Sequence, residues 1–243
     1  MRENRILAGL PSGERRLFLP SLDPIRLYVG DVIDYAGQPV RYLYFPTSAG
    51  LSIVNQQAQP NEAQLLDVSV VGKEGCTGGS IVQGSDKSAS MVLVEIGGSA
   101  VRLPASEVLG YRAQVPYLWQ AVARCNLLLY RHAVISVGCT RFHPAEQRAA
   151  RWLRAHWHRT GVESFPFSAA FFAAQVGIDE KTSTAILQAF AADGIVSLSL
   201  NNITILDHEK LALTACECFE QAKAATEEYL VDLDKIANAH DQR

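Results

Sequence analysis

The 243-residue sequence predicts an α+β fold in which a small β-roll (jelly roll) precedes a largely helical half. Residues 25–104 alternate short β-rich runs with Gly, Pro and Asp turns, a spacing typical of a small antiparallel barrel or jelly roll. From Ser106 the apolar residues recur at helical spacing instead. We therefore expect a β-roll sensor domain at 1–110 that is followed by one long helix and a helical C-terminal region.

Composition favours a globular chain of two domains, because 48% of the residues are hydrophobic and only 19% are charged. The first twenty residues are charged and amphipathic, unlike a signal peptide, and no run approaches the ~20 apolar residues of a membrane span. We expect a cytoplasmic protein without membrane contacts.

The five cysteines predict neither a disulfide framework nor a metal site, because no Cys-x-x-Cys pair and no His pair at metal spacing occurs. We expect reduced, buried thiols and no cofactor. Cys216 and Cys218 lie two apart on an expected helix and should therefore point in different directions. The cysteines are Cys76, Cys125, Cys139, Cys216 and Cys218.

The segment 111–143 predicts a long dimerisation helix. Its apolar residues fall on the a and d positions of a heptad, so a parallel copy of the same helix is the simplest partner. The alternative is that this stripe packs on the chain's own β-roll. Cys139 continues the stripe, but residues seven apart on a helix lie about 10 Å from one another, too far to share one ion. The expected seam consists of Leu118, Ala121, Cys125, Leu128, His132 and Ile135.

The segment 144–212 predicts a winged helix-turn-helix. Ser168 and Asp179 can cap two successive helices, Gly177 can form the turn between them, and Gly194 can end the second. Two strand-like runs then surround Asn201-Asn202, a hairpin signal. Residues 213–243 predict an acidic helical extension.

This order of parts resembles the Crp/Fnr superfamily of bacterial transcription regulators. The resemblance covers residues 5 to about 219 and is carried by RYLYFPTSAGLSIV, VVGKEGCTGG, AVRLP, RFHPAEQRAARWL, NNITILD and ACECF. It implies a homodimeric sensor whose effector enters the β-roll and reorients two DNA-binding heads.

The effector residues of the family are only partly present. Cyclic-nucleotide binders use a Gly-Glu pair for the ribose and an Arg-Ser/Thr-Ala run for the phosphate, whereas this chain has Gly78-Gly79 and Lys87-Ser88-Ala89. Lysine lacks the planar fork of arginine, and the carboxylate is absent. We expect no dependence on cyclic nucleotides. The oxygen-sensing branch needs a cluster of cysteines near the N-terminus, and none precedes Cys76.

The expected reader helix has lost the two arginines that read guanines in the family, because Glu180 and Ala185 stand at those positions. Residues 160–210 contain two basic and six acidic residues, a net charge of −4, which opposes the neutralisation of phosphates. Three arginines of the preceding helix, Arg148, Arg151 and Arg154, can face DNA or a domain interface. The remaining candidate DNA contacts are Lys181, Thr182, Thr184, Gln188, Ser168 and Arg148.

Two functions of different class therefore remain open. The first is a homodimeric transcription regulator that binds duplex DNA. The second is a regulator-shaped protein that has lost DNA binding and contacts another protein, with the alanine-rich segment 169–174 as a candidate surface. No catalytic motif stands above chance, so we do not expect an enzyme.

Overall fold

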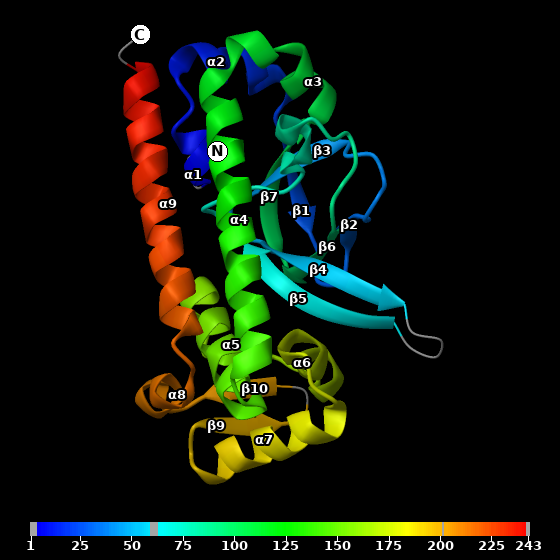
Figure 1. Cartoon of the computed structure of the whole chain (residues 1–243), viewed down its shortest axis with the longest axis vertical. Helices are drawn as coiled ribbons and strands as arrows, with labels where there is room; N and C mark the ends of the chain where they lie inside the picture. Colours follow the sequence, from blue (N-terminus) through cyan, green and yellow to red (C-terminus); the bar gives the residue numbers. More distant parts are fainter. Residues whose placement is uncertain (1–3, 59–62, 201, 242–243) are drawn as a thin grey trace. The chain divides into compact units, whose positions relative to one another are not determined.

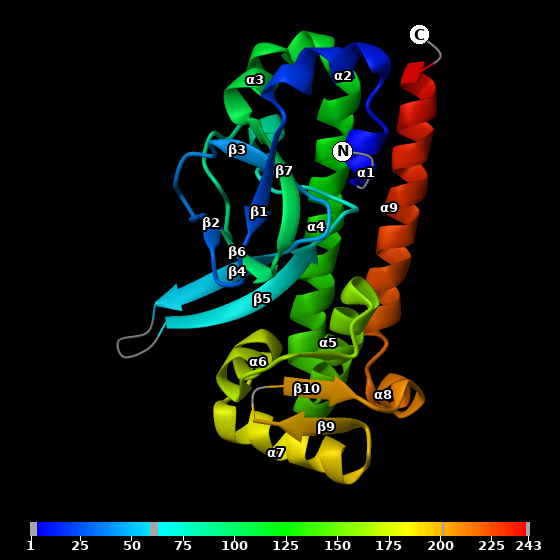
Figure 2. The ribbon, with the colours of Figure 1, turned by 180° about the vertical axis from the view of Figure 1, so that it is seen from behind.

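The computed structural model describes residues 4–58, 63–200 and 202–241. The chain forms two compact units (Figures 1 and 2). Unit 1 comprises residues 1–55, 68–132 and 224–243, and unit 2 comprises 56–67 and 133–223. Two long helices, α4 (Pro116–Phe142) and α9 (Cys218–Asp241), begin in one unit and end in the other. Among the described helices, none combines the length and the hydrophobicity needed to cross a bilayer.

Two antiparallel sheets form the β-roll, which confirms the predicted fold class. One sheet has the order β1-β7-β3 and the other has the order β2-β6-β4-β5. Leu43 lies opposite Leu103 in the first sheet, and both side chains are fully buried. The strands are β1 (Asp23–Leu27), β2 (Val32–Asp34), β3 (Tyr42–Pro46), β4 (Gly50–Ala58), β5 (Ala63–Val71), β6 (Met91–Ile96) and β7 (Gly98–Pro104).

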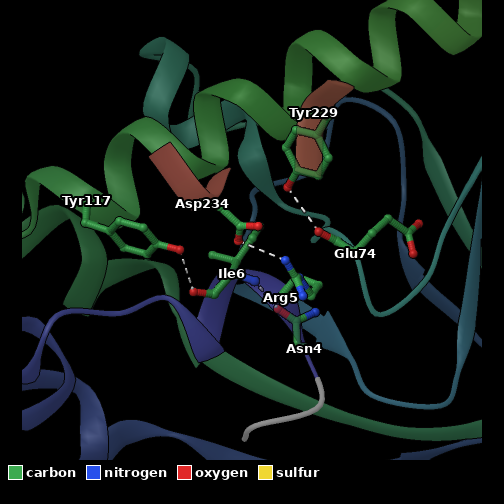
Figure 3. Close-up of polar contacts among 7 residues, drawn as sticks. All are labelled: Asn4, Arg5, Ile6, Glu74, Tyr117, Tyr229 and Asp234. Atoms are coloured by element: carbon green, nitrogen blue, oxygen red, sulfur yellow. Dashed lines mark hydrogen bonds and ion pairs between the residues drawn. The ribbon is translucent and has the colours of Figure 1, made fainter. Parts of the chain in front are cut away.

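Short helices before and after the roll contact the start of α4: α1 (Arg5–Ala8), α2 (Ser12–Phe18) and α3 (Ala105–Gly110). The carboxylate of Glu14 accepts hydrogen bonds from the backbone N–H groups of Tyr117 and Leu118, at 2.8 and 2.9 Å. These N–H groups belong to the first turn of α4, which has no partners within the helix, so Glu14 caps α4 from a distant part of the chain. The Tyr117 hydroxyl donates to the Ile6 carbonyl at 3.1 Å (Figure 3).

The second half of α9 belongs to the core of unit 1. Ala225, Tyr229 and Leu233 are buried with the residues of α1, α2 and α4. The Tyr229 hydroxyl donates to the Glu74 carbonyl, 3.0 Å away (Figure 3). The predicted acidic extension is therefore helical, and its distal part helps to form the first unit.

The seam predicted on α4 is wrong as a dimer contact. Leu118, Ala121, Cys125 and Leu128 are at most 4% exposed, because they pack into the core of unit 1. The ring nitrogens of His132 lie 3.0 Å from Ser69 Oγ and 3.3 Å from Thr226 Oγ1. Ile135 packs on buried cysteines of unit 2. The stripe therefore packs on its own chain, the alternative that the sequence left open.

A second apolar stripe of α4 is exposed. Leu127, Tyr130, Val134 and Val137 follow one another at spacings of three and four residues, and their exposed fractions are 47%, 66%, 53% and 71%. This is also an a/d spacing, one face further around the helix. We call these four residues the exposed stripe.

Unit 2 contains the predicted winged helix-turn-helix. Its core gathers Trp152, Leu153, Phe172, Phe190 and Ile203. The small sheet has the order β8-β10-β9, and Asn201, in the predicted hairpin turn, lies outside the described residues. The elements are α5 (Ala145–Thr160), β8 (Ser164–Pro166), α6 (Ala169–Val176), α7 (Glu180–Ala192), β9 (Val196–Ser199), β10 (Asn202–Ile205) and α8 (His208–Thr214).

Candidate nucleic-acid interface

The helix-turn-helix is built by the caps that the sequence predicted. Ser168 Oγ accepts a hydrogen bond from the Phe171 N–H at the start of α6, and Gly177 ends α6 at φ +71°. Asp179 then caps α7, because its Oδ1 accepts the Thr182 N–H at 2.9 Å. Its Oδ2 accepts the Thr182 hydroxyl at 2.6 Å. These hydrogen bonds hold the pKa of Asp179 below its ordinary value, so the first turn of α7 stays negatively charged.

Helix α7 divides into a buried and an exposed face. Ser183, Leu187 and Phe190 are buried in unit 2. The opposite face exposes the four residues at which the motif would meet a major groove, whereas Thr182 is half-buried. Only one of the four is basic, so readout would depend mainly on amide and hydroxyl groups. These four exposed residues are Lys181, Thr184, Ala185 and Gln188, and Glu180, which is also exposed, places a negative charge beside them.

A hollow of about 350 Å³ lies beside this face, between α7, the start of α6 and the wing. It brings together three of the predicted DNA contacts: Ser168, Thr184 and Gln188. The wing contributes Leu198 and Leu200, which were not predicted as site residues, although SLSL alternates in the manner of a strand with one apolar face. Leu200 is 98% exposed. Where a wing would need polar groups for phosphates, this one presents leucine.

Two arginines of α5, Arg148 and Arg154, make contacts inside unit 2. The Arg148 guanidinium donates to the carbonyls of Thr140 and Gly177, at 3.2 and 3.4 Å. Arg154 donates to Glu220 at 2.6 Å and lies over the Phe219 ring. The sequence had left both a DNA role and an interface role open for these side chains.

Lys210, the other basic residue of the segment 160–210, is also engaged. Its Nζ donates to the Asp193 carbonyl at 3.1 Å and lies 3.7 Å from Asp207 Oδ2. Lys181 thus remains the main positive charge that α7 itself offers to a nucleic acid.

The alanine-rich segment 169–174 is only partly available for a partner. Phe172 and Ala173 are buried in unit 2, whereas Ala170 is exposed. The wing leucines therefore form a more accessible apolar surface than α6.

The predicted effector residues lie in unit 1, where the two glycines are closely packed against neighbouring residues. A side chain at Gly78 would come within 2.5 Å of the Tyr42 carbonyl oxygen, and one at Gly79 within 2.2 Å of Asn126. Asn126 Nδ2 donates to the Gly79 carbonyl. These contacts explain the two glycines without a ligand. Lys87 is exposed, and Ser88 Oγ donates to the Ser90 carbonyl at 2.8 Å.

The prediction that Cys216 and Cys218 point apart is wrong. Cys216 precedes α9 and Cys218 opens it, so the two thiols are not two positions along one helix. Both converge with Cys139 and His143, and one ligand atom from each residue lies within 4.8 Å of all the others. The spacing Cys139-x-x-x-His143 places two ligands on one side of a helix end and could have signalled this cluster.

Comparisons with known proteins agree with this architecture. Residues 147–214 match the family model described as a Crp-like helix-turn-helix domain. Among curated proteins, no sequence matches the chain.

Solved structures share the fold of most of the chain. A protein from Eubacterium rectale that has been assigned to the Crp/Fnr family of transcriptional regulators is 16% identical with a TM-score of 0.73. The match covers 88% of this chain and 99% of that one. FixK2 from Bradyrhizobium japonicum is 12% identical with a TM-score of 0.66, over 80% and 98% of the chains. The c-di-GMP responsive regulator CLP from Xanthomonas campestris is 15% identical with a TM-score of 0.64, over 79% and 97%.

The β-roll, the long helix α4 and the winged head occur in this chain in the order expected of such regulators. Residues 147–214 are thus a Crp-like helix-turn-helix domain, and most of the chain has the same fold as solved structures of Crp/Fnr-family regulators.

Proposed function

We propose that the protein is a homodimeric transcription regulator that binds duplex DNA through α7. Electrostatic attraction to the phosphates should contribute little to its affinity for DNA. The observation that carries this proposal is the exposed face of α7, which presents Lys181, Thr184 and Gln188 from a Crp-like helix-turn-helix. Glutamine pairs with adenine, and the threonine methyl contacts the thymine methyl, so A·T pairs suit this face best.

The dimer is proposed to form through the exposed stripe of α4. Four large apolar side chains at a/d spacing are costly to leave in water, and a second copy of the same helix covers them most simply. A twofold dimer would present two copies of α7 to two half-sites of a palindrome.

Unit 1 is proposed to act without cyclic nucleotides. Gly78 and Gly79 are used in packing against β3 and α4, and Lys87 replaces the arginine that would clamp a phosphate. We also expect the protein to act in the cytoplasm, as a regulator of transcription must in a bacterium.

A selection from random duplexes with the full-length protein tests the DNA-binding proposal. We expect a palindromic, A·T-leaning consensus, bound with a shallow salt dependence because few phosphates are neutralised. Addition of cyclic AMP or cyclic GMP should change neither the consensus nor the affinity. Failure to enrich any sequence would contradict the proposal.

A double variant makes the electrostatic argument quantitative. Glu180→Arg with Ala185→Arg restores both family reading positions and changes the net charge of residues 160–210 from −4 to −1. Affinity for duplex DNA should rise, by about 1–3 kcal/mol for each arginine that meets a guanine. The control pair, Asp86→Arg with Ala89→Arg, adds the same charge at exposed positions of unit 1. An equal gain in both pairs would mean that charge alone, and not base reading, is responsible.

The apolar hollow favours a second candidate function, a head that contacts protein instead of DNA. Leu198 and Leu200 expose hydrocarbon where phosphate contacts would be made. This candidate predicts no consensus for the natural protein but a recovered consensus for the Glu180→Arg, Ala185→Arg variant.

A further inference from the structure

Three thiols and one imidazole converge in unit 2 at the point where α4 ends and α9 begins. Cys139 lies in the last turn of α4, and His143 follows that helix, with its backbone N–H bonded to the Cys139 carbonyl at 3.1 Å. Cys216 and Cys218 come from the connection between α8 and α9. The three cysteines are at most 4% exposed, and Ile135 packs against them.

The distances fit one tetrahedral ion. Metal–ligand bonds of about 2.3 Å to sulfur and 2.0–2.1 Å to nitrogen place neighbouring ligands about 3.6–3.8 Å apart. Cys139 Sγ lies 3.5 Å from Cys216 Sγ, and Cys218 Sγ lies 3.4 Å from His143 Nδ1. All four atoms lie within 4.8 Å of one another, so side-chain movements of about 1 Å complete the geometry.

The surroundings of His143 match those of a metal ligand. Its Nδ1 points toward Cys218, while its Nε2 lies 3.2 Å from Glu217 Oε1. A carboxylate that accepts the outer N–H of a ligating histidine fixes the tautomer and the ring orientation. A proton on Nε2 leaves Nδ1, 3.4 Å from Cys218 Sγ, free to bind a metal ion.

Zinc binding needs thiolates at the three cysteines. The divalent cation provides for this itself, because it replaces the thiol protons, which pass to solvent.

We propose that Cys139, His143, Cys216 and Cys218 form a structural zinc site of the Cys₃His type. Thiolate and imidazole ligands in tetrahedral arrangement select Zn²⁺ over harder cations. The site is closed, because all four positions are filled by the chain. It joins the end of α4 to the α8–α9 connection, two segments of unit 2 that are 73 residues apart between His143 and Cys216.

Metal analysis of the natural protein, purified without chelators and under reducing conditions, tests the site. We expect one zinc per chain by mass spectrometry of the metal. Replacement by Co²⁺ should give a thiolate-to-cobalt charge-transfer band and the intense ligand-field absorption of a tetrahedral site. Neither measurement needs a variant to fold.

Variants assign the ligands. Cys216→Ser and His143→Ala should each weaken zinc binding at least tenfold in competition with a chromophoric chelator, with unchanged far-ultraviolet circular dichroism. Glu217→Gln should weaken it about tenfold or more, because the outer hydrogen bond is altered while every ligand remains. Cys76→Ser, at a buried cysteine of unit 1, is the matched control and should retain one zinc per chain.

Two results would overturn the proposal. One is reduced natural protein that binds no zinc and gives no cobalt spectrum, including the case in which Cys139 and Cys216 form a disulfide on oxidation and bind no metal when reduced. The other is full zinc retention in the Cys216→Ser, Cys218→Ser double variant.

Discussion

The two faces of α4 carry similar residues in different surroundings. Leu118 is fully buried against the core of unit 1, whereas Leu127, nine residues later, is 47% exposed. Both belong to an apolar a/d stripe. The difference teaches that one long helix can carry an apolar stripe that packs on its own chain and a second apolar stripe that the chain leaves exposed, and that only burial distinguishes the two.

The largest effect is expected on the buried face. Leu118→Ala should lower the free energy of unfolding by about 2–5 kcal/mol, because it leaves a cavity in the core. Leu127→Ala is the matched control and should change it by no more than about 0.5 kcal/mol in the monomer. Denaturant unfolding at several protein concentrations measures both. Equal losses in the free energy of unfolding would show that the two faces of α4 contribute equally to the stability of the chain.

An intermediate effect is expected at the cap of α4. Glu14→Gln removes one acceptor and leaves a first-turn N–H of α4 poorly paired, at a cost of about 1–3 kcal/mol. Glu146→Gln, at an exposed carboxylate in the first turn of α5, is the control and should have little effect.

Glu14 should also give the stability a pH dependence. Burial raises the pKa of Glu14 above its ordinary value of 4.5, so the native state binds the proton more tightly than the unfolded chain. The free energy of unfolding should therefore fall as pH rises from 4.5 through the raised pKa. In Glu14→Gln this fall should be reduced, and an identical pH profile in both proteins would contradict the assignment.

The smallest effect on free energy is expected on the exposed stripe. Tyr130→Glu places a charge in the proposed dimer contact and should raise the dissociation constant by a factor of about ten, which corresponds to about 1.4 kcal/mol. Its secondary structure should not change, because Tyr130 is 66% exposed. Sedimentation at micromolar concentration measures the change, with Val231→Glu on an exposed face of α9 as control. A dimer unaffected by Tyr130→Glu would place the interface elsewhere.

The sequence predicted the elements and caps well, because these depend on local signals. Ser168, Gly177 and Asp179 take the cap and turn positions that their side chains favour. The periodicity of the sequence does not show which apolar stripe of α4 is buried, because both stripes repeat at a/d spacing. Burial depends on which stripe α9 and the β-roll cover. The roles of Arg148 and Arg154 likewise depend on tertiary neighbours that no local pattern specifies.

The cysteines show the same limit over a longer distance. Cys139 fits the heptad pattern of α4, so it was interpreted as a packing residue. That interpretation left out that Cys139 and His143, four residues later, lie on the same side of the helix end. Their spacing predicted Cys216 and Cys218 on one helix, but Cys216 lies in the connection between α8 and α9, and the two thiols come together. The convergence of two segments that are distant in sequence is set by the packing of α4 and α5 with the C-terminal helices.

The burial of Ala225, Tyr229 and Leu233 in unit 1 constrains how such a gene can evolve. Recombination could not exchange the winged head by a single crossover after α4. The reason is that α9, which follows the head in the chain, also completes the core of unit 1. A donor head would bring a foreign α9, whose side chains would have to fit against α1, α2 and α4. Exchange would require two crossovers, one before α5 and one within α9, so sensor and head should be inherited together.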